Sequence, residues 1–167
     1  MNFIAIMVVI FSSFAAAYLI IRKEIRRCKG IDSILRLIIS VKNKAIFYNA
    51  PFSEIIMQLR SNDEFHKIRL FDIFSDNLQS GMTVPEAWND AVCRSYSDID
   101  INEREILIRF GTEMCCCSRD EIPEISSRAI SEIEELRNIA IEQRNIKSKS
   151  TGAIIVSFGL MIVLILV

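Results

Sequence analysis

Two long apolar segments bracket the chain. Residues 3–21 read FIAIMVVIFSSFAAAYLII, without a charge or a proline, and residues 152–167 read GAIIVSFGLMIVLILV. As helices they would extend about 28 Å and about 24 Å, near the thickness of a bilayer's hydrocarbon core. We therefore predict three parts: an N-terminal transmembrane helix over residues 1–21, a domain over residues 22–149, and a C-terminal transmembrane helix over residues 150–167.

Between these ends, apolar residues recur at the three- and four-residue spacings of amphipathic helices. The pattern predicts a helix over residues 31–48, either continuous with the first apolar segment through Gly30, which weakens it, or separate from it. It also predicts helices over residues 52–60 and 65–79, a fourth beginning near residue 84, a fifth after Asp100, and a long sixth after Ser118 that leads into the last segment. We found no strand pattern, internal repeat or low-complexity tract. The predicted fold is all-α, a cytoplasmic helical bundle of about six helices flanked by N- and C-terminal transmembrane helices.

Local signals place several of the helix ends. Pro51 suits the first turn of a helix, where its missing N–H has no partner in any case. Thr83 and Glu86 have the spacing of a capping box, with Pro85 between them in the first turn. Gly81 suits a left-handed residue that ends the preceding helix.

Asp100 and Glu103 repeat the capping pattern at the start of the fifth helix. Three charged residues of that first turn are expected to be solvated: Glu103, Arg104 and Glu105.

Three residues are expected to pack rather than to bind a ligand. Trp88 has core-like neighbours, which favours a packing anchor over a ligand platform. Phe110 lies on the apolar stripe of the fifth helix. Gly111, inside that helix, is unfavourable by about 1 kcal/mol relative to alanine, so we expect it to admit the close approach of another helix.

Charge sets the orientation of the predicted spans. Five basic residues follow the first apolar segment, Arg22, Lys23, Arg26, Arg27 and Lys29, and two precede the second, Lys147 and Lys149. The positive-inside rule then places the N-terminus outside and the domain in the cytoplasm. The alternative is a cleaved signal peptide ending at Ala15–Ala17. No basic residue precedes the apolar run, however, and the run continues beyond those alanines.

The rest of the domain is acidic. The formal charge of the chain is −1, and the basic flanks leave −7 for residues 30–141. This argues against nucleic-acid binding, which requires a basic surface for phosphates.

The sequence contains no catalytic constellation and no cofactor or metal motif. Five cysteines, three of them adjacent (Cys115, Cys116 and Cys117), do not form a disulfide framework, and adjacent helical side chains cannot converge on one metal. The acids of the sixth helix, including Glu132, Glu134 and Glu135, have no histidine companions, so we interpret them as a solvated face. We expect a non-enzymatic protein without cofactor.

The order of several segments resembles a known family. These are the N-terminal span with its basic flank, the segments IFYNAPF at 46–52, TVPEAW at 83–88 and EILIRFG at 105–111, and the glycine-containing tail. Together they resemble the stage III sporulation protein AB family of endospore-forming Firmicutes over essentially the whole chain. The chain departs from the family after Gly111, where residues 114–118 read MCCCS.

The resemblance implies a domain similar to the cytoplasmic domain of the type II secretion platform protein F. It implies a subunit of a secretion-like channel between mother cell and forespore, located in the mother-cell membrane and required for endospore formation after engulfment. The implied partners are the sporulation secretion-type ATPase, stage III sporulation protein AA, other membrane subunits of the same complex, and a second copy of the chain. Glu132, Glu134 and Glu135 are the hypothesised ATPase dock.

A second class of function stays open at this stage. The bundle could instead belong to a membrane-anchored adaptor or sensor that binds a signalling partner.

Overall fold

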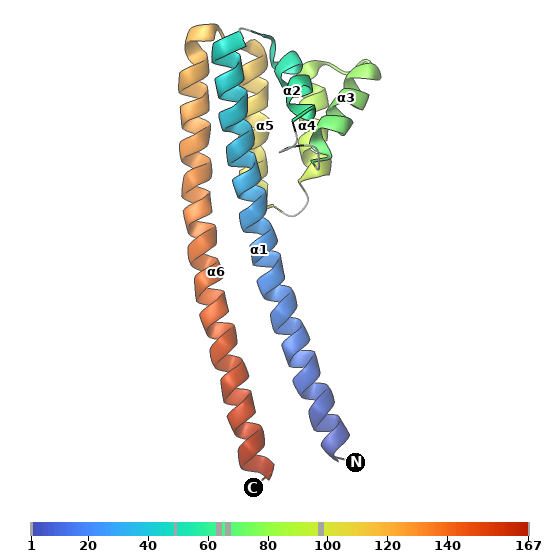
Figure 1. Cartoon of the computed structure of the whole chain (residues 1–167), viewed down its shortest axis with the longest axis vertical. Coiled ribbons are helices and arrows are strands. Elements are labelled where there is room, and N and C mark those ends of the chain that lie inside the picture. The colour runs from blue at the N-terminus through green and yellow to red at the C-terminus, as the bar shows by residue number, and fades with distance from the viewer. Residues whose placement is uncertain (1, 49, 63–64, 66–67, 97–98, 167) are drawn as a thin grey trace. The chain divides into compact units, whose positions relative to one another are not determined.

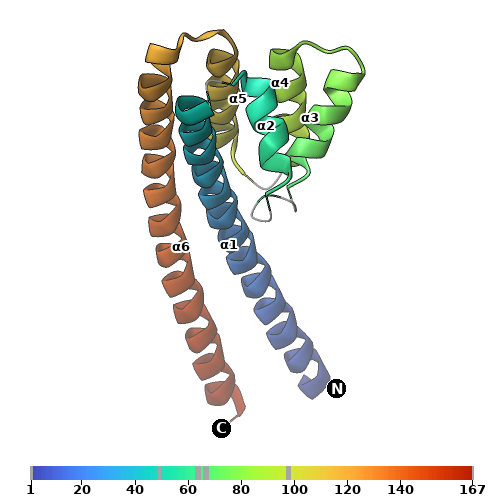
Figure 2. The ribbon, with the colours of Figure 1, turned by 45° about the horizontal axis from the view of Figure 1, so that its top comes forward.

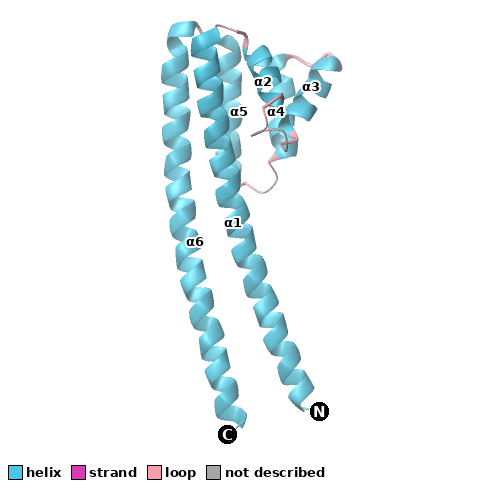
Figure 3. Ribbon diagram, in the orientation of Figure 1, coloured by secondary structure: helices cyan, strands magenta, loops and turns pink. Residues whose placement is uncertain are grey.

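The computed structural model describes the backbone of residues 2–48, 50–62, 65, 68–96 and 99–166; side chains are described over the same residues except 2–14, 16–17, 20–21 and 147–166. All regular structure in this part of the chain is helical (Figures 1 and 3). The elements are α1 (Asn2–Tyr48), α2 (Phe52–Arg60), α3 (Leu70–Gln79), α4 (Val84–Ser95), α5 (Ile101–Cys116), a 3₁₀ turn (Arg119–Glu121) and α6 (Ile122–Leu166). The predicted all-α class is confirmed.

The two predicted transmembrane segments stay predictions. Most side chains of residues 1–21, and all those of residues 150–167, lie outside the described residues. Among the residues described, no helix combines the length and the apolar character of a membrane span.

The chain divides into two compact units, and the division falls inside α1 and α6. One unit comprises residues 29–137. The other pairs residues 1–28 with residues 138–167.

Within residues 29–137, α1, α5 and α6 are joined by side-chain bonds. Arg109 on α5 pairs with Glu132 on α6, and Glu113 on α5 pairs with Arg128 on α6. Because the later residue of α5 meets the earlier residue of α6, these two helices are antiparallel, as Figures 1 and 2 show.

The same unit holds α1 against α6. Arg137 Nε on α6 donates to Asp32 Oδ1 on α1 over 2.5 Å, and Arg119 Nη2, in the 3₁₀ turn just before α6, donates to the carbonyl oxygen of Ile46 over 3.1 Å. Because the later residue of α1 again meets the earlier of the two arginines, α1 and α6 are antiparallel. The face of α1 that turns inward is the predicted apolar one, including the fully buried residues Ile31, Ile34, Ile38 and Val41.

Helices α2, α3 and α4 form a second group beside α5 (Figure 2). Buried Asn77 on α3 donates to Asp90 Oδ2 over 2.8 Å and to the carbonyl oxygen of Ala87 over 3.3 Å. These bonds tie α3 to α4.

The predicted capping residues act as expected in α4. Thr83 N donates to Glu86 Oε2 over 3.1 Å and Thr83 Oγ1 donates to the same oxygen over 2.7 Å; these bonds lower the pKa of Glu86. Gly81 has φ 90°, the left-handed conformation that glycine adopts without a steric penalty.

The predicted start of the third helix was wrong. The third helix begins at Leu70, not at Phe65. Phe65 and Ile68 lie in a turn, in which Ile68 N donates to the carbonyl oxygen of Phe65 over 2.9 Å. Phe65 is nevertheless 1% exposed, so its place in the apolar pattern reflects burial of a turn rather than a helical face.

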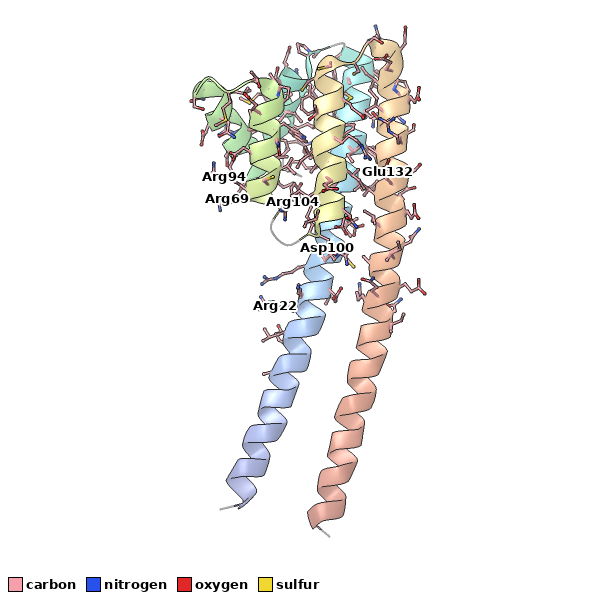
Figure 4. The ribbon with its side chains drawn as sticks, turned by 180° about the vertical axis from the view of Figure 1, so that it is seen from behind. Arg22, Arg69, Arg94, Asp100, Arg104 and Glu132 are labelled. Atoms are coloured by element: carbon pink, nitrogen blue, oxygen red, sulfur yellow. The ribbon has the colours of Figure 1, made fainter. Side chains whose placement is uncertain are left out.

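The expectation for the first turn of α5 was also wrong in part. Glu103 is fully buried, whereas Glu105 is exposed. Arg104 is half-buried (Figure 4). Its Nη2 donates to the carbonyl oxygens of Tyr96 over 3.0 Å and of Ile99 over 3.5 Å, and these bonds fasten α5 to the residues that precede it.

The unit of residues 1–28 and 138–167 is a pair of helix segments. Arg27 Nη1 on α1 donates to Gln143 Oε1 on α6 over 3.2 Å. Glu24, Cys28 and Ala140 are buried in it. The sequence placed Glu24 among the basic flank, yet it turns away from solvent, so the exposed flank is more purely cationic than its composition indicates.

Candidate partner-binding surfaces

Trp88 lies where four helices meet. Its ring is in edge contact with Phe52 of α2, at a centroid distance of 5.0 Å, and with Phe74 of α3, at 6.1 Å. Its Nε1 donates to the carbonyl oxygen of Leu107 on α5 over 2.9 Å. The side chain is fully buried, which leaves it no ligand-facing surface.

Gly111 provides the space that the indole occupies. A Cβ atom at this position would lie 2.1 Å from Trp88 Nε1, well inside any real contact distance. The close approach expected at Gly111 is therefore made by a side chain, the indole of α4, rather than by a helix backbone. Phe110 beside it is 1% exposed.

Pro51 and Pro85 differ in surroundings. Pro51 is exposed in the connection between α1 and α2, with its carbonyl oxygen accepting from Ile55 N over 3.1 Å. Pro85 is half-buried in the first turn of α4.

The three glutamates of the hypothesised dock do not share one environment. Glu132 lies between α6 and α5, where it pairs with Arg109 (Figure 4). Glu134 and Glu135 are exposed on α6. Only these last two are available to a partner without breaking a bond inside the domain.

Most of the described side chains of the basic flank are exposed and could contact a partner. Arg22, Lys23, Arg26 and Lys29 are exposed on α1, while Arg27 is half-buried and bonded to Gln143. The side chains of Lys147 and Lys149 lie outside the described residues.

Two thiols of the cysteine cluster, those of Cys115 and Cys117, have the character of poor nucleophiles. All five cysteines are free, and among the described residues no group of three or more His, Cys, Asp or Glu could hold a metal ion. Burial, followed by the neighbouring thiols of Cys116 and Cys117, raises the pKa of Cys115 to about 11. Burial also raises the pKa of Cys117. A thiol with a raised pKa carries little thiolate at neutral pH and is a poor nucleophile.

Sequence reasoning missed one surface, at the end of α1. Phe47 and Tyr48 are 81% and 67% exposed, although both are large and aromatic. The unit of residues 29–137 also contains a hollow of about 280 Å³. The residues that line it include Ala45, Pro51, Phe52, Met114, Cys115 and Arg119. The available signal was that Phe47 and Tyr48 fall off the apolar face of their helix.

Comparison with known proteins identifies the family. The family model described as stage III sporulation protein AB matches residues 2–167. The chain belongs to the stage III sporulation protein AB family. A solved structure titled stage III sporulation protein AB superposes with a TM-score of 0.57 at 20% identity, covering 72% of this chain and 98% of that one. The chain has no significant match among curated proteins.

At 20% identity, the similarity to this solved structure is evidence of a shared fold alone. The segment after Gly111, where we expected the chain to depart from the family, forms a turn between two helical elements. Cys117 ends α5, and Ser118 forms a capping box with Glu121, whose Oε2 accepts from Ser118 N over 2.8 Å. A serine at this position is therefore sufficient to start the next turn.

Proposed function

We propose that this sporulation protein is a non-enzymatic, membrane-anchored subunit of a secretion-like channel between mother cell and forespore. The observation that carries the proposal is the family match over residues 2–167, which includes both apolar ends. The exposed cations Arg22, Lys23 and Arg26 beside the first apolar segment support an anchor with the domain on the cytoplasmic side. The fully buried indole of Trp88 supports a structural role for the bundle.

A complementation experiment tests the role. A clean deletion in the native organism, followed with a late forespore-specific fluorescent reporter, should arrest sporulation after engulfment. The full chain should restore reporter activity, and residues 30–149 alone should not. Normal spores from the deletion strain, or rescue by residues 30–149, would overturn the proposal.

We further propose that the acidic domain docks the secretion-type ATPase, stage III sporulation protein AA, through the exposed part of α6. Glu134 and Glu135 are the acids to test, since reversing Glu132 would also break its pair with Arg109. Glu134→Lys combined with Glu135→Lys should weaken co-purification of the ATPase with the full chain. The matched control is Glu105→Lys, an exposed acid on α5. Equal recovery of the ATPase with all three chains would exclude this dock.

A further inference from the structure

Helix α1 presents an exposed strip of side chains where the first apolar segment ends. Tyr18 and Leu19 are 62% and 63% exposed, and Arg22, Lys23 and Arg26 are exposed as well. At about 100° per residue, these five side chains lie within about 140° of one another around the helix, and we call them the α1 strip. In Figure 4, Arg22 projects from the side of α1 that is turned away from α6.

The positive charge of the α1 strip is not offset by an acid on the same face of the helix. Glu24 is the only acid of residues 1–29, and its side chain is 8% exposed, on the same side of α1 as buried Cys28. Arg27 is half-buried and donates to Gln143, so it does not belong to the strip. The strip therefore presents three cations to whatever covers it.

A fourth exposed cation lies at the same level, on α6. Because α1 and α6 are antiparallel, the bond from Arg27 to Gln143 places Arg144 level with Arg26. Arg144 is exposed. The cations of the two helices thus occupy one band, next to the apolar segments at the two ends of the chain.

The order of side chains along the α1 strip follows the cross-section of one bilayer leaflet. The apolar segment of residues 3–21 comes first, with the ring of Tyr18 near its end, and the cations come next. Tyrosine is enriched at the boundary between hydrocarbon and headgroups. From Arg22 to Arg26 the helix rises about 6 Å, which is about the thickness of the headgroup region on one side of a bilayer.

This order favours an anionic phospholipid as the occupant. A guanidinium group can donate two parallel hydrogen bonds to one phosphate group, and the lipid's acyl chain continues from that phosphate toward Leu19 and Tyr18. An acidic protein surface would neutralise the cations but would not supply the acyl chain. A zwitterionic lipid carries its own cation beside the phosphate, so it leaves the charge of the strip unbalanced.

We propose that the α1 strip binds an anionic phospholipid, with the headgroup phosphate held by Arg22 and Arg26 and an acyl chain along Leu19. A lipid with one net negative charge, such as phosphatidylglycerol, represents the ligand class. This inference rests on the membrane anchor proposed above and adds lipid selectivity to it.

Native mass spectrometry of the full chain in detergent tests the proposal. Titration with phosphatidylglycerol, or with phosphatidylcholine of the same acyl chains, gives a dissociation constant for the first bound lipid. We expect phosphatidylglycerol to bind at least about fivefold more tightly. Arg22→Gln and Arg26→Gln should each weaken its binding about fivefold, the effect of about 1 kcal/mol for one cation near an anionic surface. Neither variant should change the binding of phosphatidylcholine.

The matched control is Arg69→Gln, which removes an exposed cation just before α3 and should leave the binding of phosphatidylglycerol unchanged. Equal affinity for the two lipids, or equal weakening by Arg69→Gln, would overturn the proposal. Glycerol phosphate at the same concentration should not displace the lipid. Displacement would mean that the strip recognises a soluble phosphate, which would overturn the assignment to a lipid.

Flotation of the full chain with phosphatidylcholine vesicles separates this proposal from the anchor on which it rests. A chain that floats but does not prefer phosphatidylglycerol keeps the anchor and loses the lipid site. A chain that does not float overturns both. In native membranes, a benzophenone amino acid at position 19 should crosslink to lipid, and a crosslink to an acidic protein instead would overturn the proposed occupant.

Discussion

At the scale of single residues, the tightest constraint is the fit of Trp88 over Gly111. Gly111→Ala places a methyl group where the indole lies, so either the ring or the helix has to move. We expect a loss of at least about 2 kcal/mol in the free energy of unfolding, as in other overpacked cores. Urea unfolding of the full chain followed by circular dichroism measures this. Glu105→Ala, at an exposed position of α5, should stay within about 0.5 kcal/mol of the original protein.

The thiol of Cys115 gives a second residue-scale prediction. Its pKa of about 11 means that the thiolate fraction, and with it the rate of alkylation, is small at pH 8 and rises up to about pH 11. Peptide mapping after iodoacetamide treatment should show exposed Cys116 modified well before Cys115 at pH 8. Equal rates for the two thiols would contradict the burial described for Cys115.

At this scale, burial could be predicted from the sequence where it depends on neighbours along one helix, but not where it depends on how two helices meet. That Trp88 packs in a core could be predicted from its apolar neighbours along one helix. That its indole fills the space of Gly111 could not, since it depends on how α4 meets α5. The burial of Glu103 was missed similarly, because a charged residue in a first turn is usually solvated and only the fold encloses it.

At the scale of elements, ion pairs set the alignment of α5 with α6. The pair of Arg109 and Glu132 is partly exposed, so its worth is limited to about 1 kcal/mol or less. Arg109→Glu and Glu132→Arg should each lower stability by up to about that amount, and the double variant should recover most of it. Thermal unfolding of the four proteins completes this double-mutant cycle. Additive losses in the double variant would mean that the pair contributes nothing specific.

Helix boundaries could be predicted where local chemistry marks them. The range of the second helix, and the start of the fourth at Val84 after its cap Thr83, followed from proline and capping signals that act within one turn. The start of the third helix could not be predicted in this way, because Phe65 keeps the apolar spacing while lying in a turn.

At the scale of the whole molecule, the two interpretations of the N-terminal segment predict mature proteins of different mass. An uncleaved anchor retains the whole chain of 19.1 kDa, whereas a signal peptide cut after Ala17 leaves a shorter protein. We expect the intact mass of the membrane-extracted protein to be that of the full chain, and the protein to resist extraction at alkaline pH. A lower mass, equal to that of a chain that begins after Ala17, would contradict the anchor and indicate a secreted domain.

The position of Trp88 has a spectroscopic consequence. It is the only tryptophan in the chain, and its indole is shielded from water by groups from α2, α3 and α5. Its fluorescence should therefore emit at short wavelength in the native protein and shift to the red when those helices separate. Events at the surface of α6 should leave the emission unchanged. The chain thus contains its own optical probe, which distinguishes opening of the bundle from association between intact copies.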